Sequence, residues 1–233
     1  MSDRPIRAIV VADGAVPERA TLDAAWPGWG DGTLLVVAAD GGARGAIRLG
    51  LTIDRWVGDG DSLTEGELAE LEAAGIPIER SPVDKDESDA ELAVVAAVRL
   101  GATDVTILGA LGGERVDHAL ANIALLAHSA LAGKPARLLD AAARLRLIEA
   151  PAPEGGPASL SLEGRVGDGV SLLPFGSDVR GVTTAGLRYP LDDEDLLFGA
   201  ARGLSNVRVS AAARVTARIG RLLVVETPAT LTR

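Results

Sequence analysis

Cysteine is absent from the 233-residue chain, and aromatic residues make up only 3% of it. The lack of cysteine excludes disulfides, thiolate catalysis and zinc–sulfur sites. Hydrophobic residues nevertheless account for 47% of the chain. We therefore expect a core built mainly from alanine, leucine and valine, in a chain long enough for one large domain or two small ones.

Basic residues are also few: 23 Lys and Arg stand against 33 Asp and Glu, which gives a net charge of −10. General nucleic-acid binding needs basic surface, so this balance argues against it. The segment Met1–Pro5 lacks the apolar core of a signal peptide, and no uncharged apolar run is long enough to span a bilayer. We expect a soluble, cytoplasmic protein with no nucleic-acid or membrane partner.

The first part of the chain alternates strand-like and helix-like segments. Helices are predicted at Ala43–Leu49, after the caps Thr64 and Ser88, and along a longer stretch bearing Leu120, Ile123, Ala124, Ala127 and Leu131 on one face. Strands are predicted at Ile6–Ala12, Leu34–Ala39, Ile53–Val57, Ile76–Glu79 and Thr103–Leu108. This alternation predicts an α/β, Rossmann-like three-layer domain with a mostly parallel sheet and flanking helices.

The pattern changes after the proline- and glycine-rich stretch Pro151–Pro157, which has the composition of a linker. Short alternating segments follow at 158–162, 169–173, 179–184, 207–210, 214–219 and 222–226. Such segments between turn residues predict a small antiparallel β-sandwich or barrel. The predicted domains are therefore residues 1–150 and 151–233.

Four acidic motifs each follow a predicted strand or turn in the first domain. They are Asp40–Ala43, Gly58–Ser62, Lys85–Asp89 and Arg115–His118. Like charges gathered at one edge of a sheet repel one another unless a cation neutralises them. Ligands of such sheets bind beyond the carboxyl ends of the strands, and Mg²⁺ takes carboxylate and phosphate oxygens. The pattern predicts a Mg²⁺–phosphate site.

The motifs also have simpler interpretations. A calcium loop starting at Asp59 fails at Leu63, where an oxygen ligand is expected, and at Thr64, where glycine is expected. A plain turn remains an alternative for Gly58–Ser62. Helix capping explains Ser88 but does not explain Lys85, whose ammonium can meet a phosphate.

The glycine turn Gly109–Gly113 opens a helix, as suits a phosphate group, and Arg115 adds a fork of donors. His118 and Asn122 share one face of that helix, where His118 can position Asp117 or a ligand. P-loop, dinucleotide-binding, His-Glu-x-x-His and Gly-x-Ser-x-Gly signatures are all absent.

The order of these motifs resembles that of the thiamine pyrophosphokinase family. That family carries an Asp-Gly-Gly-Ala turn, a Gly-Asp-x-Asp-Ser loop, a Lys-Asp-x-Ser/Thr-Asp segment and a Gly-Gly-Arg-x-Asp-His-x-x-x-Asn segment. The last corresponds here to Gly112–Asn122, interrupted by an additional residue, Glu114. Val170–Pro174, Gly186–Leu191 and Leu204–Asn206 are similar to the family's smaller thiamine-binding domain.

The resemblance implies diphosphate transfer from ATP to the hydroxyl of thiamine, giving thiamine diphosphate and AMP. It also implies site residues. Asp59, Asp61 and Asp89 would be catalytic and bind Mg²⁺, with Asp117 as a further catalytic carboxylate. The ATP-binding candidates are Asp40, Lys85, Asp86, Ser88, Arg115, His118 and Asn122.

Ser205, Asn206 and Tyr189 would contact thiamine, and the family implies a homodimer. Two alternatives stay open on the sequence alone. One is another Mg²⁺-dependent phosphotransferase or nucleotide hydrolase on the same scaffold. The other is a non-catalytic sensor of thiamine or nucleotide, although a pure binder would not need so many paired carboxylates.

Overall fold

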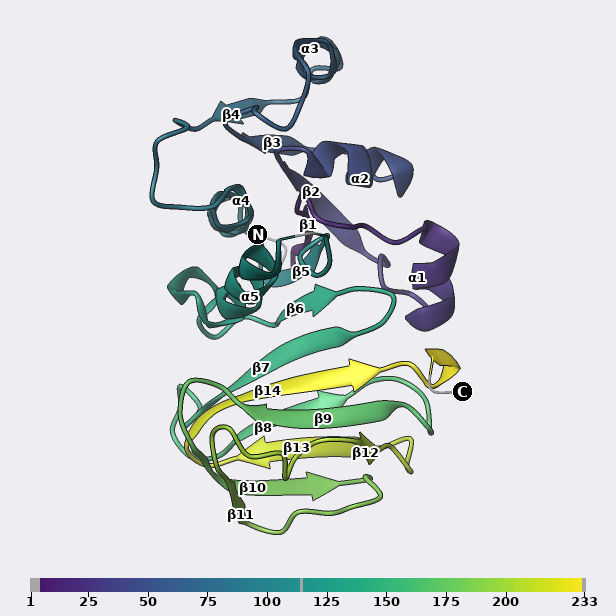
Figure 1. Cartoon of the computed structure of the whole chain (residues 1–233), viewed down its shortest axis with the longest axis vertical. Helices are drawn as coiled ribbons and strands as arrows, with labels where there is room; N and C mark the ends of the chain where they lie inside the picture. Colours follow the sequence, from purple (N-terminus) through teal and green to yellow (C-terminus); the bar gives the residue numbers. More distant parts are fainter. Residues whose placement is uncertain (1–4, 114, 232–233) are drawn as a thin grey trace. The chain divides into compact units, whose positions relative to one another are not determined.

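The computed structural model describes residues 5–113 and 115–231, which fall into two compact units divided between Ala141 and Ala142 (Figure 1). The division lies before the boundary at residue 150 that the linker composition indicates. The reason is that Arg144–Ala150 forms a strand, β7, which pairs with β14 (Gly220–Thr227) of the second unit.

The first unit is a parallel sheet in the order β6-β5-β1-β2-β3-β4. Its strands are β1 (Arg7–Val11), β2 (Thr33–Ala39), β3 (Arg55–Gly58), β4 (Ile78–Arg80), β5 (Asp104–Leu108) and β6 (Ala136–Leu139). Its helices are α1 (Arg19–Ala25), α2 (Gly42–Arg48), α3 (Glu65–Ala73), α4 (Asp89–Arg99) and α5 (Val116–Ala124), followed by short 3-10 turns at Leu125–Ala127 and Ser129–Leu131.

Side-chain alternation along the strands builds a core on each face of this sheet. Ile9, Val36 and Trp56 face α1, α2 and α3, which contribute buried leucines and alanines. The other face is covered by α4, whose Ala93 and Val94 are fully buried and which packs on β1, β2 and β3 (Figure 1). The first unit is therefore the expected three-layer α/β arrangement.

Local sequence explains where two of these helices begin. Thr64 accepts a hydrogen bond from the Glu67 backbone, and the Glu67 carboxylate accepts one from the Thr64 backbone, which completes a capping box at α3. Ser88 accepts a hydrogen bond from the Glu91 backbone and starts α4. The two caps fix where the loops Asp59–Ser62 and Ser81–Glu87 end.

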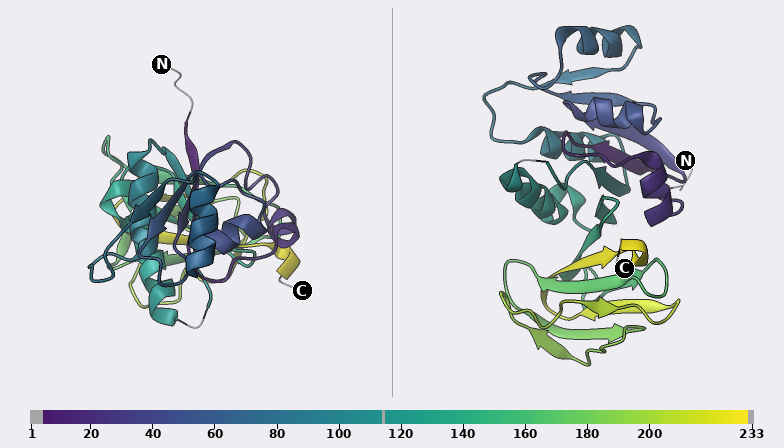
Figure 2. Two further views of the ribbon diagram at one scale, coloured as in Figure 1. Left: turned by 90° about the horizontal axis from the view of Figure 1, so that it is seen from above. Right: turned by 45° about the vertical axis from the view of Figure 1, so that its right-hand side comes forward.

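The second unit consists of two antiparallel sheets in the orders β7-β14-β9-β12 and β11-β10-β13-β8. Its other strands are β8 (Ala158–Leu162), β9 (Gly169–Pro174), β10 (Val179–Ala185), β11 (Glu194–Leu196), β12 (Asn206–Val207) and β13 (Ala213–Ala217). Their inward side chains form one core that includes Leu172, Val215 and Leu222. The strands of this unit lie in layers (Figure 2).

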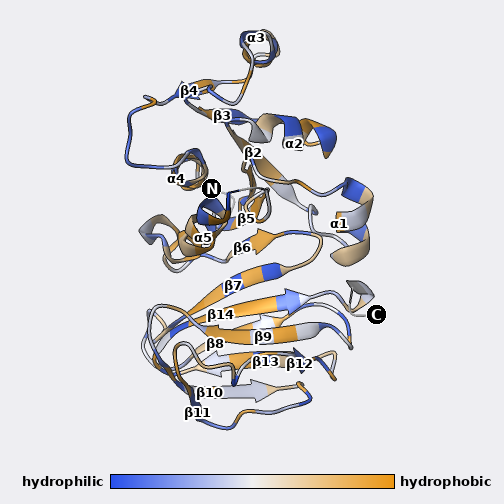
Figure 3. Ribbon diagram, viewed as in Figure 1, coloured by the Kyte–Doolittle hydropathy of each residue, from blue (hydrophilic) through white to orange (hydrophobic). Residues whose placement is uncertain are grey.

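The predicted fold class is confirmed, with two separate sheets in the second unit rather than a barrel. Hydrophobic strands such as β6 and β14 stand out in both units (Figure 3). The structure adds elements that the sequence pattern did not predict, namely α1, β6, β7 and β11. It also ends α5 at Ala124, where a longer helix was expected. Within residues 5–113 and 115–231, no helix has the length and apolar character needed to cross a membrane.

Candidate active site

A cleft of about 480 Å³ opens in the first unit where β1, β2, β3 and β5 end. Because these strands are parallel, their carboxyl ends meet at one edge, and the loops that follow them form its walls. The predicted site residues that line it are Asp40, Asp59, Asp61, Lys85, Ser88, Asp89, Arg115, His118 and Asn122. Asp86 and Asp117 are exposed and are not among the lining residues.

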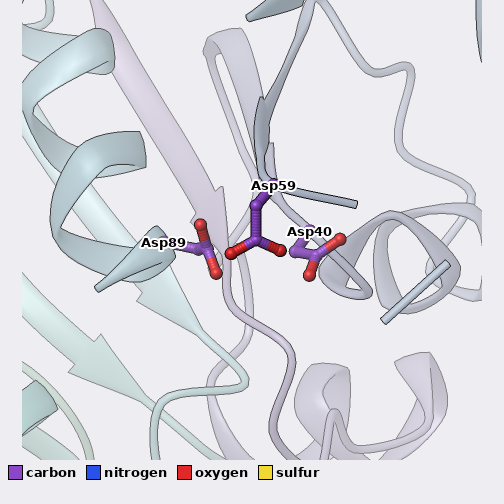
Figure 4. Close-up of side chains that lie close together, drawn as sticks. All are labelled: Asp40, Asp59 and Asp89. Atoms are coloured by element: carbon purple, nitrogen blue, oxygen red, sulfur yellow. The ribbon is translucent and has the colours of Figure 1, made fainter. Parts of the chain in front are cut away.

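Three carboxylates meet inside this cleft. Asp40 follows β2, Asp59 follows β3, and Asp89 begins α4, yet each offers an oxygen within 4.8 Å of the others. Figure 4 shows the Asp59 carboxylate between those of Asp40 and Asp89. Asp61 lines the same cleft and is held next to Asp59, because its backbone N–H donates to Asp59 Oδ1 at 3.0 Å.

Asp40 is the most constrained of the three. It is only 2% exposed, and its φ of +44° lies in the left-handed region that most non-glycine residues avoid. The Trp56 indole donates to its carbonyl at 3.0 Å, and the Ser62 backbone donates to its Oδ2 at 3.2 Å. Strain of this kind persists only where the surroundings enforce it, and it is typical of functional sites.

The charge of Asp40 is poorly compensated in the metal-free protein. Burial raises the pKa of its carboxyl to about 6, against the effect of the Ser62 hydrogen bonds and with further contributions from Asp61 and Asp89. Its Oδ1 is buried and has no hydrogen-bond partner among the residues that the structure describes. A buried oxygen of this kind needs either a proton or a cation.

Lys85 supplies the positive charge beside the other two carboxylates. Its Nζ lies 2.9 Å from Asp59 Oδ2 and 2.9 Å from Asp89 Oδ1, and it donates to Ser81 Oγ at 3.1 Å. The Lys85 side chain is 10% exposed. Burial lowers the pKa of Lys85, but its bonds to Asp89 and Asp59 outweigh burial and raise it, while the Lys85 hydrogen bond lowers the pKa of Asp59.

Asp13 is a cleft residue that the sequence analysis did not select. It follows β1, lines the cleft, and has its pKa raised by burial, partly opposed by a hydrogen bond with Ser62. Its carboxylate lies against Gly41, where an added Cβ would come 2.1 Å from Asp13 Oδ1. The signal was available, since Asp13 follows a predicted strand just as Asp40 does.

The glycines of the Asp40–Ala43 motif have a steric role. A Cβ on Gly42 would lie 2.0 Å from the backbone oxygen of Val11. Real Cβ atoms do not approach backbone this closely, so α2 can start beside β1 only with glycine at this position. The motif thus brings Asp40 to the edge of the sheet and lets the helix pack behind it.

The last predicted motif forms the start of α5. Arg115 Nε and Nη2 donate to Asp117 Oδ1 and Oδ2 at 2.9 and 2.6 Å, and this pairing lowers the pKa of Asp117. The Asn122 amide donates to the Ala110 carbonyl at 3.0 Å, which ties α5 to the glycine turn. His118 is exposed and lines the cleft. Glu114, the additional residue in this motif, lies outside the described residues.

The donor set fits a hard divalent cation. Its atoms are carboxylate oxygens from three different segments, and the Asp40 carboxylate also has a buried Oδ1 without a hydrogen-bond partner among the described residues. Mg²⁺ is bound in proteins through one or two carboxylates together with waters and substrate phosphates. Lys85 adds a cation that can meet phosphate oxygens in the same cleft.

The three residues predicted to contact thiamine lie in the second unit. Ser205 and Tyr189 are exposed, whereas Asn206 is 7% exposed. The Asn206 side chain bonds to the backbone of Tyr189 at both its oxygen and its nitrogen. The structure thus brings the three together, with Asn206 behind the other two.

Carboxylates and a lysine gathered at the strand ends of an α/β unit are suited to binding a phosphate-bearing ligand, and a β-sandwich forms the second unit of the chain. Two family models match the chain: "Thiamin pyrophosphokinase, catalytic domain" at residues 30–136 and "Thiamin pyrophosphokinase, vitamin B1 binding domain" at residues 159–222. Together they cover nearly three quarters of the sequence. The chain belongs to the thiamin pyrophosphokinase family, which confirms the resemblance drawn from the motifs.

Individual relatives agree. The thiamine pyrophosphokinase of Bacillus subtilis (strain 168) is 28% identical over 180 residues, covering 77% of this chain and 80% of that protein. A crystal structure of the enzyme from Bacillus subtilis superposes with a TM-score of 0.80 at 24% identity, covering 95% of this chain and 99% of the other. The thiamin pyrophosphokinase structure from Candida albicans gives 0.75 at 14% identity, covering 96% and 89%. These structural similarities establish the fold.

Proposed function

We propose that the protein transfers a diphosphate group from ATP to the hydroxyl of thiamine, giving thiamine diphosphate and AMP. The observation that carries the proposal is the cluster of Asp40, Asp59 and Asp89 with Lys85 in one cleft, in a chain whose two units match the family's catalytic and vitamin B1 binding domains. No observation favours a hydrolase or a sensor instead.

The cleft residues divide into cation holders and phosphate holders. Asp59 and Asp89, with Asp61 beside them, would hold Mg²⁺, and the buried Oδ1 of Asp40 makes that residue a further ligand candidate. When bound, the cation supplies neutralisation of the negative charge that develops on the phosphate oxygens. Lys85, next to Asp59 and Asp89, and Arg115, which lines the same cleft, would hold the phosphates, Lys85 as a point charge and Arg115 through its planar set of N–H donors.

In the reaction, one bond to the β-phosphorus forms and another bond to the same phosphorus breaks. The thiamine hydroxyl oxygen forms a bond to that phosphorus, the bridging oxygen leaves with AMP, and the hydroxyl proton passes to a carboxylate or to solvent. Little covalent chemistry is asked of the protein. Its side chains act by aligning the hydroxyl with the leaving oxygen and by stabilising charge, which are the main contributions to phosphoryl transfer.

The remaining roles follow the same division. Ser88, His118 and Asn122 shape the ATP side of the cleft, and Ser205 and Tyr189 offer the thiamine contacts of the second unit. Asp86 and Asp117 do not line the cleft but lie next to residues that do. Asp117 would act by holding Arg115, with which it forms an ion pair. A homodimer, which the family resemblance implies, and a cytoplasmic location are part of this proposal.

The experiment is product analysis of the purified protein with ATP, Mg²⁺ and thiamine. Thiamine diphosphate and AMP in equal amounts, lost on chelation, are the expected products. ADP with thiamine monophosphate would overturn the transfer of an intact diphosphate. Turnover of another alcohol but not of thiamine would point to a different phosphotransferase, and thiamine binding without turnover would point to a sensor.

A further inference from the structure

The side chain of Asn206 forms hydrogen bonds with the backbone of two residues, and one of them, Tyr189, is exposed. Asn206 Oδ1 accepts from the Tyr189 N–H at 3.0 Å and from the Val207 N–H at 2.9 Å, and its Nδ2 donates to the Tyr189 carbonyl at 2.6 Å. The residue itself is 7% exposed. Both acceptor positions of the amide oxygen and one of its two N–H donors are therefore occupied inside the protein.

These bonds extend the pairing between two segments. The Arg188 N–H donates to the Val207 carbonyl at 2.8 Å, and Leu187 forms a bridge with Arg208. The Asn206 amide thus adds two hydrogen bonds to this pairing, one with the Tyr189 N–H and one with the Tyr189 carbonyl. The Tyr189 side chain beyond it is 55% exposed.

The loop that leads into Asn206 is fixed as well. A Cβ on Gly203 would lie 2.1 Å from the Leu172 carbonyl oxygen, so Gly203 packs directly on β9. Ser205 has a φ of +60° and donates its N–H to Ser171 Oγ at 3.2 Å, while its side chain faces outward. A strained backbone held from both sides fits a surface that must keep one shape.

We propose that Asn206 is a positioning residue, which sets the substrate preference through Tyr189, and that the Tyr189 ring is the contact for the cationic, aromatic thiamine. The inference rests on the proposed function, since it takes thiamine as the substrate. It differs from the expectation that Asn206 touches thiamine directly. Three of the four hydrogen-bonding positions of this buried amide are already used inside the protein, whereas the exposed ring has a whole face to offer.

The chemistry of the ligand matches that ring. Thiamine carries a positively charged thiazolium and a flat pyrimidine, and an aromatic face attracts both by cation–π interaction and stacking. Tyr189 is the one tyrosine of the sequence. A ring on an untethered loop would require its backbone to become ordered when it meets the ligand, and the bonds from Asn206 to the Tyr189 backbone lower that cost in advance.

The test is a double-mutant cycle on the KM for thiamine, using the full-length protein, Asn206→Ala, Tyr189→Ala and the double variant. Loss of the ring contact is expected to raise this KM by roughly threefold to thirtyfold, the range of a cation–π contact. Asn206→Ala should raise it similarly while leaving the KM for ATP within about twofold, and should add less than about twofold in the Tyr189→Ala background. Effects that multiply in the double variant would overturn the proposal, as would a Tyr189→Ala variant with unchanged KM.

A second readout does not depend on turnover. Because the chain has one tyrosine, 3-fluorotyrosine labelling gives a single ¹⁹F resonance that reports on position 189. Titration with thiamine alone should shift this resonance saturably in the parent protein, and Asn206→Ala should weaken the saturation. No shift in a folded parent protein would overturn the proposal. A saturable shift without any thiamine diphosphate formation would leave the positioning role standing and would sink the proposed function.

Folding is controlled by two further variants. Asn206→Asp keeps the acceptor for the Tyr189 and Val207 N–H groups but removes the donor to the Tyr189 carbonyl, and it replaces Asn206→Ala in the cycle if that variant does not fold. Thr184→Val removes a different buried bond of the same unit, from the Leu191 N–H to Thr184 Oγ1 at 2.9 Å. It should lower the melting temperature without changing the KM for thiamine; an equal rise in this KM would show a general structural effect and overturn the specific one.

Discussion

Replacing Asp40 by asparagine should make the metal-free protein more stable and the metal site weaker. Asparagine has almost the same shape, tolerates a positive φ, and can still accept the Ser62 backbone bond. The substitution therefore removes the charge with little change in packing. It tests whether the buried carboxylate is kept for its chemistry at the expense of stability.

The magnitude follows from the pKa of Asp40, which burial raises from 3.8 to about 6. Because this folded-state pKa lies above the unfolded value, the folded protein holds the proton more tightly. The ionised carboxylate thus lowers the free energy of unfolding fully above pH 6 and not at all below pH 4. At roughly 1.4 kcal/mol per pKa unit, the upper limit is about 3 kcal/mol.

The assay is urea unfolding of the parent protein and of Asp40→Asn in EDTA, at pH 8 and at pH 4. The variant should gain up to about 3 kcal/mol at pH 8 and less than about 1 kcal/mol at pH 4. Asp84→Asn, an exposed carboxylate on the loop before Lys85, is the matched control and should change neither value. A variant less stable than the parent at pH 8, or equally stabilised at both pH values, would refute the reasoning.

The same pair of proteins tests the metal assignment by calorimetry. Loss of an oxygen ligand should weaken Mg²⁺ binding by at least roughly tenfold in Asp40→Asn, by comparison with the effect of changes next to metal sites. Unchanged Mg²⁺ affinity would remove Asp40 from the ligand set, whatever the stability result.

Three other expectations concern the cleft and the second unit. Asp59→Asn and Asp61→Asn should each abolish most turnover while the circular dichroism spectrum and melting temperature stay near those of the parent; a near-normal rate with Mg²⁺ would contradict their assignment as ligands. Gly42→Ala should destabilise the protein by about 1–3 kcal/mol, because its Cβ would lie 2.0 Å from the Val11 carbonyl oxygen; urea unfolding with no loss of stability would show that α2 can move. Ser205→Ala should raise the KM for thiamine more than that for ATP, and equal rises in steady-state kinetics would contradict a place in the thiamine pocket.

The sequence predicted the fold well where local chemistry and hydrophobic patterning agree. Thr64 with Glu67, and Ser88 alone, mark two helix starts that the structure reproduces. Prediction from the sequence failed for elements that form only through contacts with other parts of the chain. β11 has three residues, and β7 carries two arginines, Arg144 and Arg146, that read as surface residues. Both arginines are buried because each bonds Glu226, 80 or more residues along the chain.

The candidate site shows the same limit. Strand ends place the acidic motifs at one edge, so the cleft follows from the sequence. The sequence does not reveal which carboxylates come together, because Asp40 lies near Asp59 and Asp89 with its backbone in a left-handed conformation. Ser205 and Asn206 are adjacent in the chain, yet Ser205 is exposed and Asn206 is buried. No local pattern states that Asn206 bonds a residue 17 positions away.

Lys85 has a consequence for how the site fills. Its ammonium lies between Asp59 and Asp89 and stays protonated over the whole neutral range, because its pKa is raised. A divalent cation that enters this space must displace the ammonium from at least one carboxylate. The lysine then has a positive charge without a partner, next to the place where a polyphosphate arrives. Under the proposed assignment, cation entry and nucleotide binding would be linked through this ammonium, so the protein should hold Mg²⁺ more tightly with ATP than without it.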